Sequence, residues 1–132
     1  MLLVDTNVLV DVLQDDPQWA DWSIAQLRAQ AKLHALAINP VIYAEMSLSF
    51  STIEALDDVV LAMALELREI PRPALFLAAK AYALYRRRGG SKGQVLPDFL
   101  IGAHAAVEGW PLLTRDASRF KTYFPTLDVI CP

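Results

Sequence analysis

The sequence VLPDFLIGAHA, residues 95–105, is the stretch from which the rest of the chain can be interpreted. Proline at the first position of a helix, followed by an acidic residue, is typical of a helix start, and the residues after Asp98 are mostly apolar. The pattern predicts a core helix from Pro97 to about Gly109. It also places the carboxylate of Asp98 at the opening of that helix.

Three other acidic residues stand in similarly apolar surroundings. Asp5 ends an apolar run at the N-terminus, Glu45 lies in an apolar helical pattern, and Asp116 follows a short predicted strand. A buried carboxylate costs several kcal/mol unless a partner compensates it. Because the sequence offers few obvious cationic partners for these acids and Asp98, the pattern predicts a bound cation.

Composition restricts the class of protein. The 132 residues are 55% hydrophobic with a mean hydropathy of +0.30, which indicates one domain, residues 1–132, whose apolar surface is partly covered by another chain. The longest uncharged apolar run, residues 36–44, is shorter than the roughly 20 residues of a membrane span. Asp5 interrupts any signal peptide, and Cys131 is the only cysteine. We therefore expect a cytoplasmic protein with no intrachain disulfide and no membrane partner.

Predicted strands and helices alternate along the chain. Such alternation is typical of βαβ units, in which parallel strands are joined by crossover helices. The sequence therefore predicts an α/β fold with a mainly parallel central sheet flanked by helices. The predicted strands are residues 1–5, 34–38, 67–70, 112–114 and 127–130, and the predicted helices are residues 8–13, 17–32, 41–50, 52–64, 73–88 and 97–109, with a short helical turn from Asp116.

The four acids are predicted to meet at one edge of this sheet. In open α/β sheets, ligands bind beyond the carboxyl ends of the strands. Asp5 and Asp116 follow predicted strands, whereas Asp98 and Glu45 lie near the starts of predicted helices. A cage of carboxylates suits Mg²⁺ or Mn²⁺, which prefer oxygen ligands, and such an ion can activate water and neutralise charge on a phosphoryl group.

Each acid also has a simpler explanation. Three of them can cap the helices beside them or stabilise a helix dipole. Glu45 is harder to explain in this way, because it shares a predicted apolar helix face with Val41 and Leu48. Each acid alone is weak evidence for a metal site, and the argument depends on the set.

Polar residues beside the acids fit either interpretation. Asn7 can orient Asp5 or contact a water on the ion, and it can also form a local turn. Thr114 can support Asp116 in the same way. Arg115 can contact a phosphate or face solvent.

No motif for nucleophilic catalysis accompanies the acids. His104 lies about 120° around its helix from Asp98, so it is predicted to be structural or to face a partner rather than to act as a base. The sequence contains no Ser–His–acid order that stands out, no P-loop and no zinc-finger spacing.

Charge is distributed unevenly along the chain. Residues 1–66 hold two basic and ten acidic side chains (net −8) and residues 67–132 hold ten and five (net +5), in agreement with the −3 of the whole chain. The first basic cluster is either a phosphate-contacting patch or the basic last turn of a helix that stops at Gly89-Gly90. The two clusters are Arg86, Arg87, Arg88 and Lys92, and Arg115, Arg119 and Lys121.

Four segments in this order resemble the PIN-domain family, and more narrowly its VapC-type toxins of bacterial toxin–antitoxin pairs. They are LVDTNVL (residues 3–9), YAE (residues 43–45), DFLIGAHA (residues 98–105) and LTRD (residues 113–116) continuing to Phe120. The resemblance covers nearly the whole chain, although residues 52–94 carry no diagnostic motif. The fold it implies is a PIN-like three-layer α/β/α arrangement.

The function implied by this resemblance is a Mg²⁺- or Mn²⁺-dependent endoribonuclease. Asp5, Glu45, Asp98 and Asp116 would bind the metal and act in catalysis, with Asn7 and Thr114 as supporting residues. Water activated by the metal would attack an RNA phosphodiester. A homodimer and a cognate antitoxin that covers the site are also implied. Arg86, Arg87, Arg88, Lys92, Arg115 and Arg119 become candidate RNA contacts, chosen by charge.

Other functions remain open on the sequence. The same acids would suit a metal-dependent phosphatase or a DNA-directed nuclease. A PIN nuclease of RNA processing would need no antitoxin. In a non-catalytic α/β interaction module, the acids would only cap helices. Pocket access and a neighbouring antitoxin gene would separate these alternatives.

Overall fold

The computed structural model describes residues 1–90 and 95–132, and its described residues form a central sheet of five strands in the order β3-β2-β1-β4-β5. Every neighbouring pair of strands is parallel, as predicted. Leu3 in the central strand is paired with Ala37 on one side and with Leu112 on the other. The strands are β1 (Leu2–Val4), β2 (Leu36–Ile38), β3 (Leu65–Leu67), β4 (Leu112–Leu113) and β5 (Val129–Ile130).

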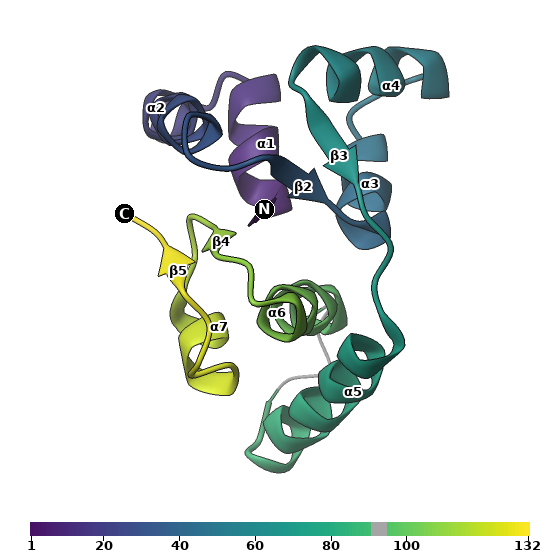
Figure 1. The fold of residues 1–132 in the computed structure, drawn as a ribbon, viewed down its shortest axis with the longest axis vertical. Helices are drawn as coiled ribbons and strands as arrows, with labels where there is room; N and C mark the ends of the chain where they lie inside the picture. Colours follow the sequence, from purple (N-terminus) through teal and green to yellow (C-terminus); the bar gives the residue numbers. More distant parts are fainter. Residues whose placement is uncertain (91–94) are drawn as a thin grey trace.

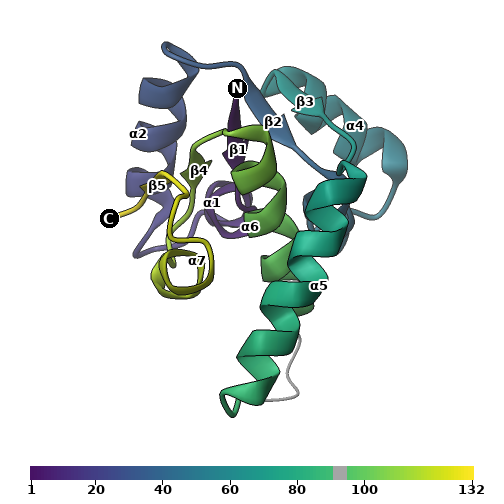
Figure 2. The same cartoon turned by 60° about the horizontal axis from the view of Figure 1, so that its bottom comes forward.

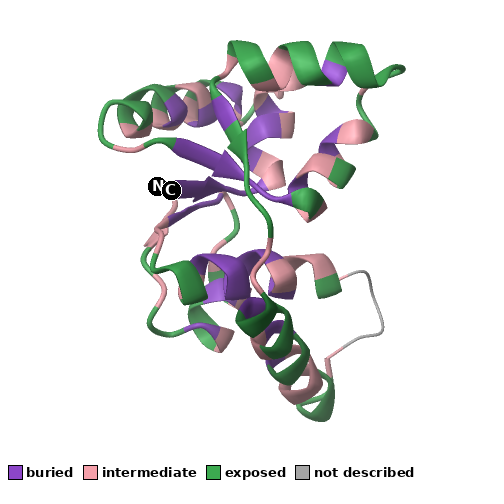
Figure 3. Cartoon of the chain, turned by 45° about the vertical axis from the view of Figure 1, so that its right-hand side comes forward, coloured by how far each residue is buried: buried purple, intermediate pink, exposed green. Residues whose placement is uncertain are grey.

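Helices cover both faces of the sheet, so the predicted three-layer α/β/α architecture is confirmed (Figure 1, Figure 3). One layer contains α1 (Thr6–Leu13), α2 (Ala20–Ala31), α3 (Pro40–Ser47) and α4 (Ile53–Ala62). The opposite layer contains α5 (Arg72–Arg87), α6 (Leu96–Glu108) and α7 (Ser118–Tyr123). The end of α5 extends away from the sheet (Figure 2). Among the described residues, no helix is long and apolar enough to cross a membrane.

Local sequence explains the central elements. All three residues of β1 are fully buried, as expected for a strand covered on both faces. Asn39 caps α3 by accepting a hydrogen bond from the N–H of Ile42 at 3.0 Å. Gly109 ends α6 with a φ of 71°, a left-handed conformation that favours glycine. Gly102 lets α6 approach α7, since a Cβ there would lie 2.5 Å from Phe124 Cε2.

Three predicted boundaries were wrong by three residues, and the other boundaries differ by two residues or fewer. Strand β3 is Leu65–Leu67 rather than 67–70, because residues 65–67 are the ones that pair with Leu36–Ile38 of β2. Helix α2 begins at Ala20 rather than at Pro17, because Asp16 Oδ1 accepts the N–H groups of Gln18 and Trp19 and holds a turn there. Helix α3 ends at Ser47 rather than at residue 50.

The strand order places the expected ligand-binding position of the sheet at the carboxyl ends of β1 and β4. The chain proceeds from β1 through β2 to β3 and then returns to β4 on the other side of β1. At such a reversal point, the connections that follow the two neighbouring strands run in opposite directions and leave a crevice between them. Ligands of open α/β sheets bind in this crevice. Asp5 directly follows β1 and Thr114 directly follows β4, so the predicted site lies at this reversal point.

Candidate active site

Asp5 is the most buried of the four predicted acids, with 5% of its surface exposed. Its Oδ1 accepts the N–H of Thr6 at 2.8 Å and so caps α1, while its Oδ2 accepts the hydroxyl of Thr114 at 2.8 Å. Burial raises the pKa of Asp5 to about 7; the negative charges of Asp98 and Glu45 also raise it, and the hydrogen bonds from Thr114 and Thr6 lower it. Asp5 therefore caps α1, and it does so at a buried position near two other carboxylates.

Thr114 connects the ends of the two central strands. The side chain is fully buried, and besides donating to Asp5 its Oγ1 accepts the N–H of Asp116 at 3.2 Å and Nδ2 of Asn7 at 3.3 Å. Thr114 contacts the backbone of Asp116, the acid it was expected to support, and also Asp5. Thr114 orients Asp5 directly, and Asn7 reaches Asp5 only through Thr114.

Glu45 joins the same network from α3. The hydroxyl of Thr6 donates to Oε1 of Glu45 at 2.6 Å. The predicted apolar face around Glu45 was wrong, because Ile42 and Met46 form the buried face of α3 and Leu48 is 90% exposed. Glu45 is half-buried, and its negative charge acts on Asp5.

Asp98 lies in the first turn of α6, as predicted, but it has a cationic partner. Arg119 of α7 donates through Nη1 to Oδ2 of Asp98, and both side chains are about one-third exposed. Burial raises the pKa of Asp98, Arg119 opposes that rise and the charge of Asp116 adds to it. Arg119, which the sequence analysis selected as a candidate RNA contact, therefore forms an ion pair with Asp98.

The four acids lie at one edge of the sheet, as predicted, although Asp116 is exposed. Hydrogen bonds through Thr6 and Thr114 connect Glu45, Asp5 and the backbone of Asp116. Asp98 is close enough to Asp5 and to Asp116 to take part in the pKa shifts of this site.

The chemistry of these donors fits a hard divalent cation. All four side chains offer carboxylate oxygens, and a cation would relieve the repulsion that helps to raise the pKa of Asp5. In the described part of the chain, no three His, Cys, Asp or Glu side chains converge as a ready ligand set. Asp98 is paired with Arg119 instead.

Asp11 is an acid that the sequence analysis did not select. It is 2% exposed on α1, and its carboxylate receives two bonds from Arg115, Nε to Oδ2 at 2.8 Å and Nη2 to Oδ1 at 3.0 Å. Arg115 is therefore paired with an acid, and 30% of its side chain is exposed. The available signal was an acid inside an apolar helix, four residues after Asn7 and on the same helical face.

Three arginines at the end of α5 keep the exposure expected of RNA contacts. Arg86, Arg87 and Arg88 are exposed, and within residues 1–90 and 95–132 none forms an ion pair. The guanidinium carbon of Arg86 lies 6.0 Å from the ring centroid of Tyr82, and that of Arg88 lies 5.8 Å from that of Tyr123. The remaining candidate in this cluster, Lys92, lies outside the described residues.

His104 has a structural environment, consistent with one of its two predicted roles. The side chain is fully buried, its Nδ1 lies 3.2 Å from Nδ2 of Asn39, and its ring lies 5.2 Å from that of Trp110. Burial lowers the pKa of His104. Because Asn39 also caps α3, His104 links α6 to the start of α3 in the core.

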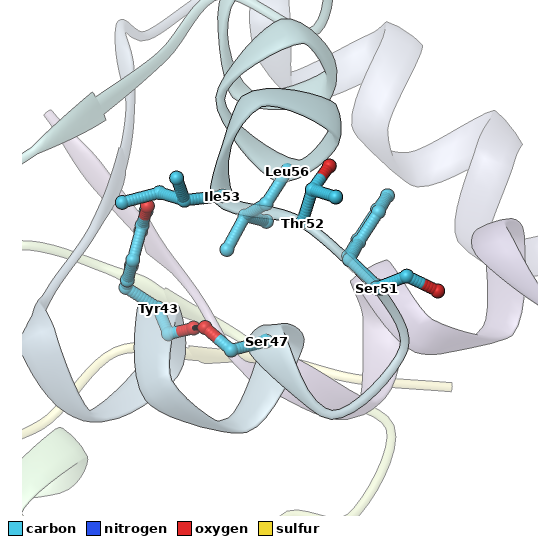
Figure 4. Close-up of a pocket in the computed structure, with 7 residues that line it drawn as sticks. Tyr43, Ser47, Ser51, Thr52, Ile53 and Leu56 are labelled. Atoms are coloured by element: carbon cyan, nitrogen blue, oxygen red, sulfur yellow. Dashed lines mark hydrogen bonds between the residues drawn. The ribbon is translucent and has the colours of Figure 1, made fainter.

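Helix α3 lines two of the hollows formed by the described residues. One, of about 210 Å³, is lined by Tyr43 and Ser47 of α3 and by residues 50–53 and Leu56, and Figure 4 shows the Ser47 hydroxyl bonded to the Tyr43 carbonyl. Its described lining carries no charge, so it is separate from the acids. The other, of about 360 Å³, lies against α6. It is lined by Pro40, Val41, Ala44, Glu45, Leu96, Pro97 and Leu100.

The sequence model of the PIN domain matches residues 2–124, and the chain therefore belongs to the PIN domain family. No curated protein sequence is significantly similar to it.

Solved structures with similar folds come from toxin–antitoxin and related complexes. The structure of VapBC2 from Rickettsia felis bound to a promoter DNA fragment has a TM-score of 0.75 at 23% identity, over 99% of this chain and 98% of that chain. DNA-bound VapBC from Salmonella typhimurium has a TM-score of 0.71 at 20% identity, over 99% and 98%. FitAcB from Neisseria gonorrhoeae has a TM-score of 0.68 at 19% identity, over 98% and 96%. At these identities the likeness establishes a shared fold.

Proposed function

We propose that this protein is the toxin of a toxin–antitoxin pair and acts as a Mg²⁺- or Mn²⁺-dependent endoribonuclease. The observation that carries the proposal is the buried Asp5 at the strand-reversal point, whose pKa is raised to about 7 by burial and by the nearby charges of Asp98 and Glu45. Membership of the PIN domain family supports it, as does the fold shared with VapBC complexes.

In this proposal the four acids hold the divalent ion and their neighbours orient them. Such an ion polarises a water for attack and neutralises charge on the scissile phosphate. Thr114 holds the carboxylate of Asp5 at the end of β1, and Thr6 directs Glu45 towards it. Preorganisation by these two hydroxyl groups would keep the negative charges together before RNA binds.

The exposed arginines of α5 are the RNA contacts that we assign first. Arg115 and Arg119 are already paired with Asp11 and Asp98, whereas Arg86, Arg87 and Arg88 have no acidic partner among the described residues. Phosphate contacts by such side chains supply affinity without reading sequence. Lys92 is assigned to the same surface by charge alone.

The antitoxin would cover the apolar groove between α3 and α6. Its described lining is apolar apart from Glu45 at its border, so a partner segment seated there would also close access to the acids. A homodimer and a cytoplasmic location complete the proposal, and the single cysteine is consistent with a reducing compartment.

RNA cleavage by the purified, antitoxin-free protein tests this function. We expect cleavage of total cellular RNA with Mg²⁺ or Mn²⁺ and none with EDTA. Asp98→Asn should retain the fold but lose at least about 100-fold in rate, because it removes one ligand charge and little volume. A folded Asp98→Asn variant with the wild-type rate would contradict the site. Cleavage of DNA but not RNA would mean that the substrate is DNA. Absence of both metal binding and cleavage would favour the non-catalytic interaction module.

A further inference from the structure

The buried Asp11 and the half-buried Arg115 form an ion pair between α1 and the segment that joins β4 to α7. The side chain of Asp11 is 3% exposed and that of Arg115 is 30% exposed. Two parallel bonds, Nε to Oδ2 at 2.8 Å and Nη2 to Oδ1 at 3.0 Å, fix the guanidinium in one orientation. Arg115 belongs to the segment that places Thr114 and Asp116.

Both ends of this ion pair are held by further contacts. Ser23 of α2 donates its hydroxyl to Oδ2 of Asp11 at 3.0 Å, and the guanidinium carbon of Arg115 lies 5.5 Å from the ring centroid of Trp19. These contacts restrict Asp11 from one side and Arg115 from the other. The pair therefore connects α1, the loop around Trp19, α2 and the segment after β4.

The same face of α1 also holds the backbone of that segment. Asn7, one helical turn before Asp11, accepts the N–H of Arg115 at 3.1 Å and donates to Oγ1 of Thr114 at 3.3 Å. Asn7 fixes the start of the segment, and Asp11 fixes the side chain in its middle. Both residues of α1 therefore act on the segment that carries Thr114 and Asp116.

We infer that Asp11 is a positioning residue of the nuclease site. Through Arg115 it fixes the path of residues 114–116, and with it the positions of the Thr114 hydroxyl and the Asp116 carboxylate relative to Asp5. The inference rests on the proposed function, and it concerns a residue that touches none of the four acids through a described hydrogen bond.

Stability alone is a weak reason for this arrangement. An ion pair with a buried partner, such as Asp11, can often be replaced by apolar residues of similar volume without loss of stability, because desolvation of the charges offsets their attraction. What apolar residues cannot reproduce is the fixed orientation of a guanidinium held at two points. Stability and activity should therefore respond differently when the pair is replaced as a whole.

Two variants and one control separate the roles. Asp11→Asn removes the charge of one partner, and Asp11→Leu combined with Arg115→Met replaces the pair by apolar side chains. Glu66→Gln breaks the exposed ion pair of Glu66 with Arg68, which is 3.6 Å long, and serves as the control. Thermal unfolding, kcat and KM on RNA, and Mn²⁺ affinity by calorimetry are measured for each.

We expect Asp11→Asn to lower kcat or the Mn²⁺ affinity by about 10- to 100-fold, with KM for RNA within about twofold of wild type. The double variant should regain the wild-type unfolding temperature but not the wild-type kcat. The control should match wild type in all three measurements. If Asp11→Asn does not fold, the double variant alone decides.

Recovery of kcat together with stability in the double variant would overturn the inference, because the pair would then be purely structural. Wild-type kcat and Mn²⁺ affinity in folded Asp11→Asn would also overturn it. Failure of the proposed function has a different signature, since the wild-type protein itself would then neither cleave RNA nor bind Mn²⁺.

Discussion

At the scale of single residues, the surroundings of Asp5 disfavour its charged form. Burial raises its pKa from 3.8 to about 7, and the neighbouring acids add to that rise. Between these two values the folded protein binds a proton that the unfolded chain releases. The stability linked to this proton is therefore fully present below about pH 4 and is lost as the pH rises to about 7. Over this range the free energy of unfolding of the metal-free protein should decrease by up to about 4 kcal/mol.

Asp5→Asn tests this interpretation of the site. The variant should stabilise the metal-free protein at pH 8 by about 2 kcal/mol, remove the decrease between pH 4 and 7, and abolish RNA cleavage. Urea unfolding in EDTA from pH 4 to 8 measures the first two effects. Asp58→Asn, at an exposed position of α4, is the matched control and should change stability by less than about 0.5 kcal/mol. A destabilised Asp5→Asn at pH 8 would contradict the account.

The sequence identified the four acids because a carboxylate next to apolar residues needs an explanation wherever it occurs. It did not reveal their partners. Thr6 reaches Glu45 from 39 residues away and Arg119 reaches Asp98 from 21 residues away, distances at which only the folded chain specifies a contact. Asp11 was missed for the same reason, because its charge is compensated by an arginine 104 residues later.

At the scale of elements, the ends of β1 and β4 are joined by one buried hydroxyl. Thr114→Val keeps the shape of the side chain and removes the bonds to Asp5, Asn7 and the backbone of Asp116. We expect a loss of about 1–3 kcal/mol in unfolding free energy and at least about tenfold in RNA cleavage rate. Thr114→Ser retains the hydroxyl and should keep the rate within about threefold. Equal cleavage by the valine and serine variants would show that the hydroxyl has no role.

Periodicity predicted the order and type of the elements, since buried strands and helix starts carry strong local patterns. Periodicity was less informative about where an element ends and which of its faces is buried. In β3 only Leu65 is buried, so apolar residues beyond it shifted the predicted strand. In α3 the apolar content of both faces concealed which one packs, and Ile42 and Met46 rather than Leu48 are in the core. Tertiary packing decides such cases.

At the scale of the whole molecule, a basic surface at the end of α5 accompanies an acidic site in a chain of net charge −3. If Arg87 and Arg88 contact RNA phosphates, replacing both by glutamine should weaken RNA binding. The slope of log affinity against log salt should fall by about 0.7 for each arginine on single-stranded RNA. Fluorescence anisotropy in EDTA measures this.

Arg72→Gln is the matched control, because Arg72 is exposed at the opposite end of the same helix. The control should leave both the affinity and the salt slope unchanged. If it weakens binding as much as the paired replacement does, net charge rather than the α5 surface determines RNA binding.

The central claim is that four acids from four distant segments form one divalent-metal site. Calorimetric titration of the metal-free protein with Mn²⁺ tests it without reference to any substrate. We predict saturable binding to the wild-type protein, at least about tenfold weaker binding to Asp98→Asn and to Asp5→Asn, and unchanged binding to Asp58→Asn. No binding to the wild-type protein, or equal affinity in all three variants, would contradict the claim.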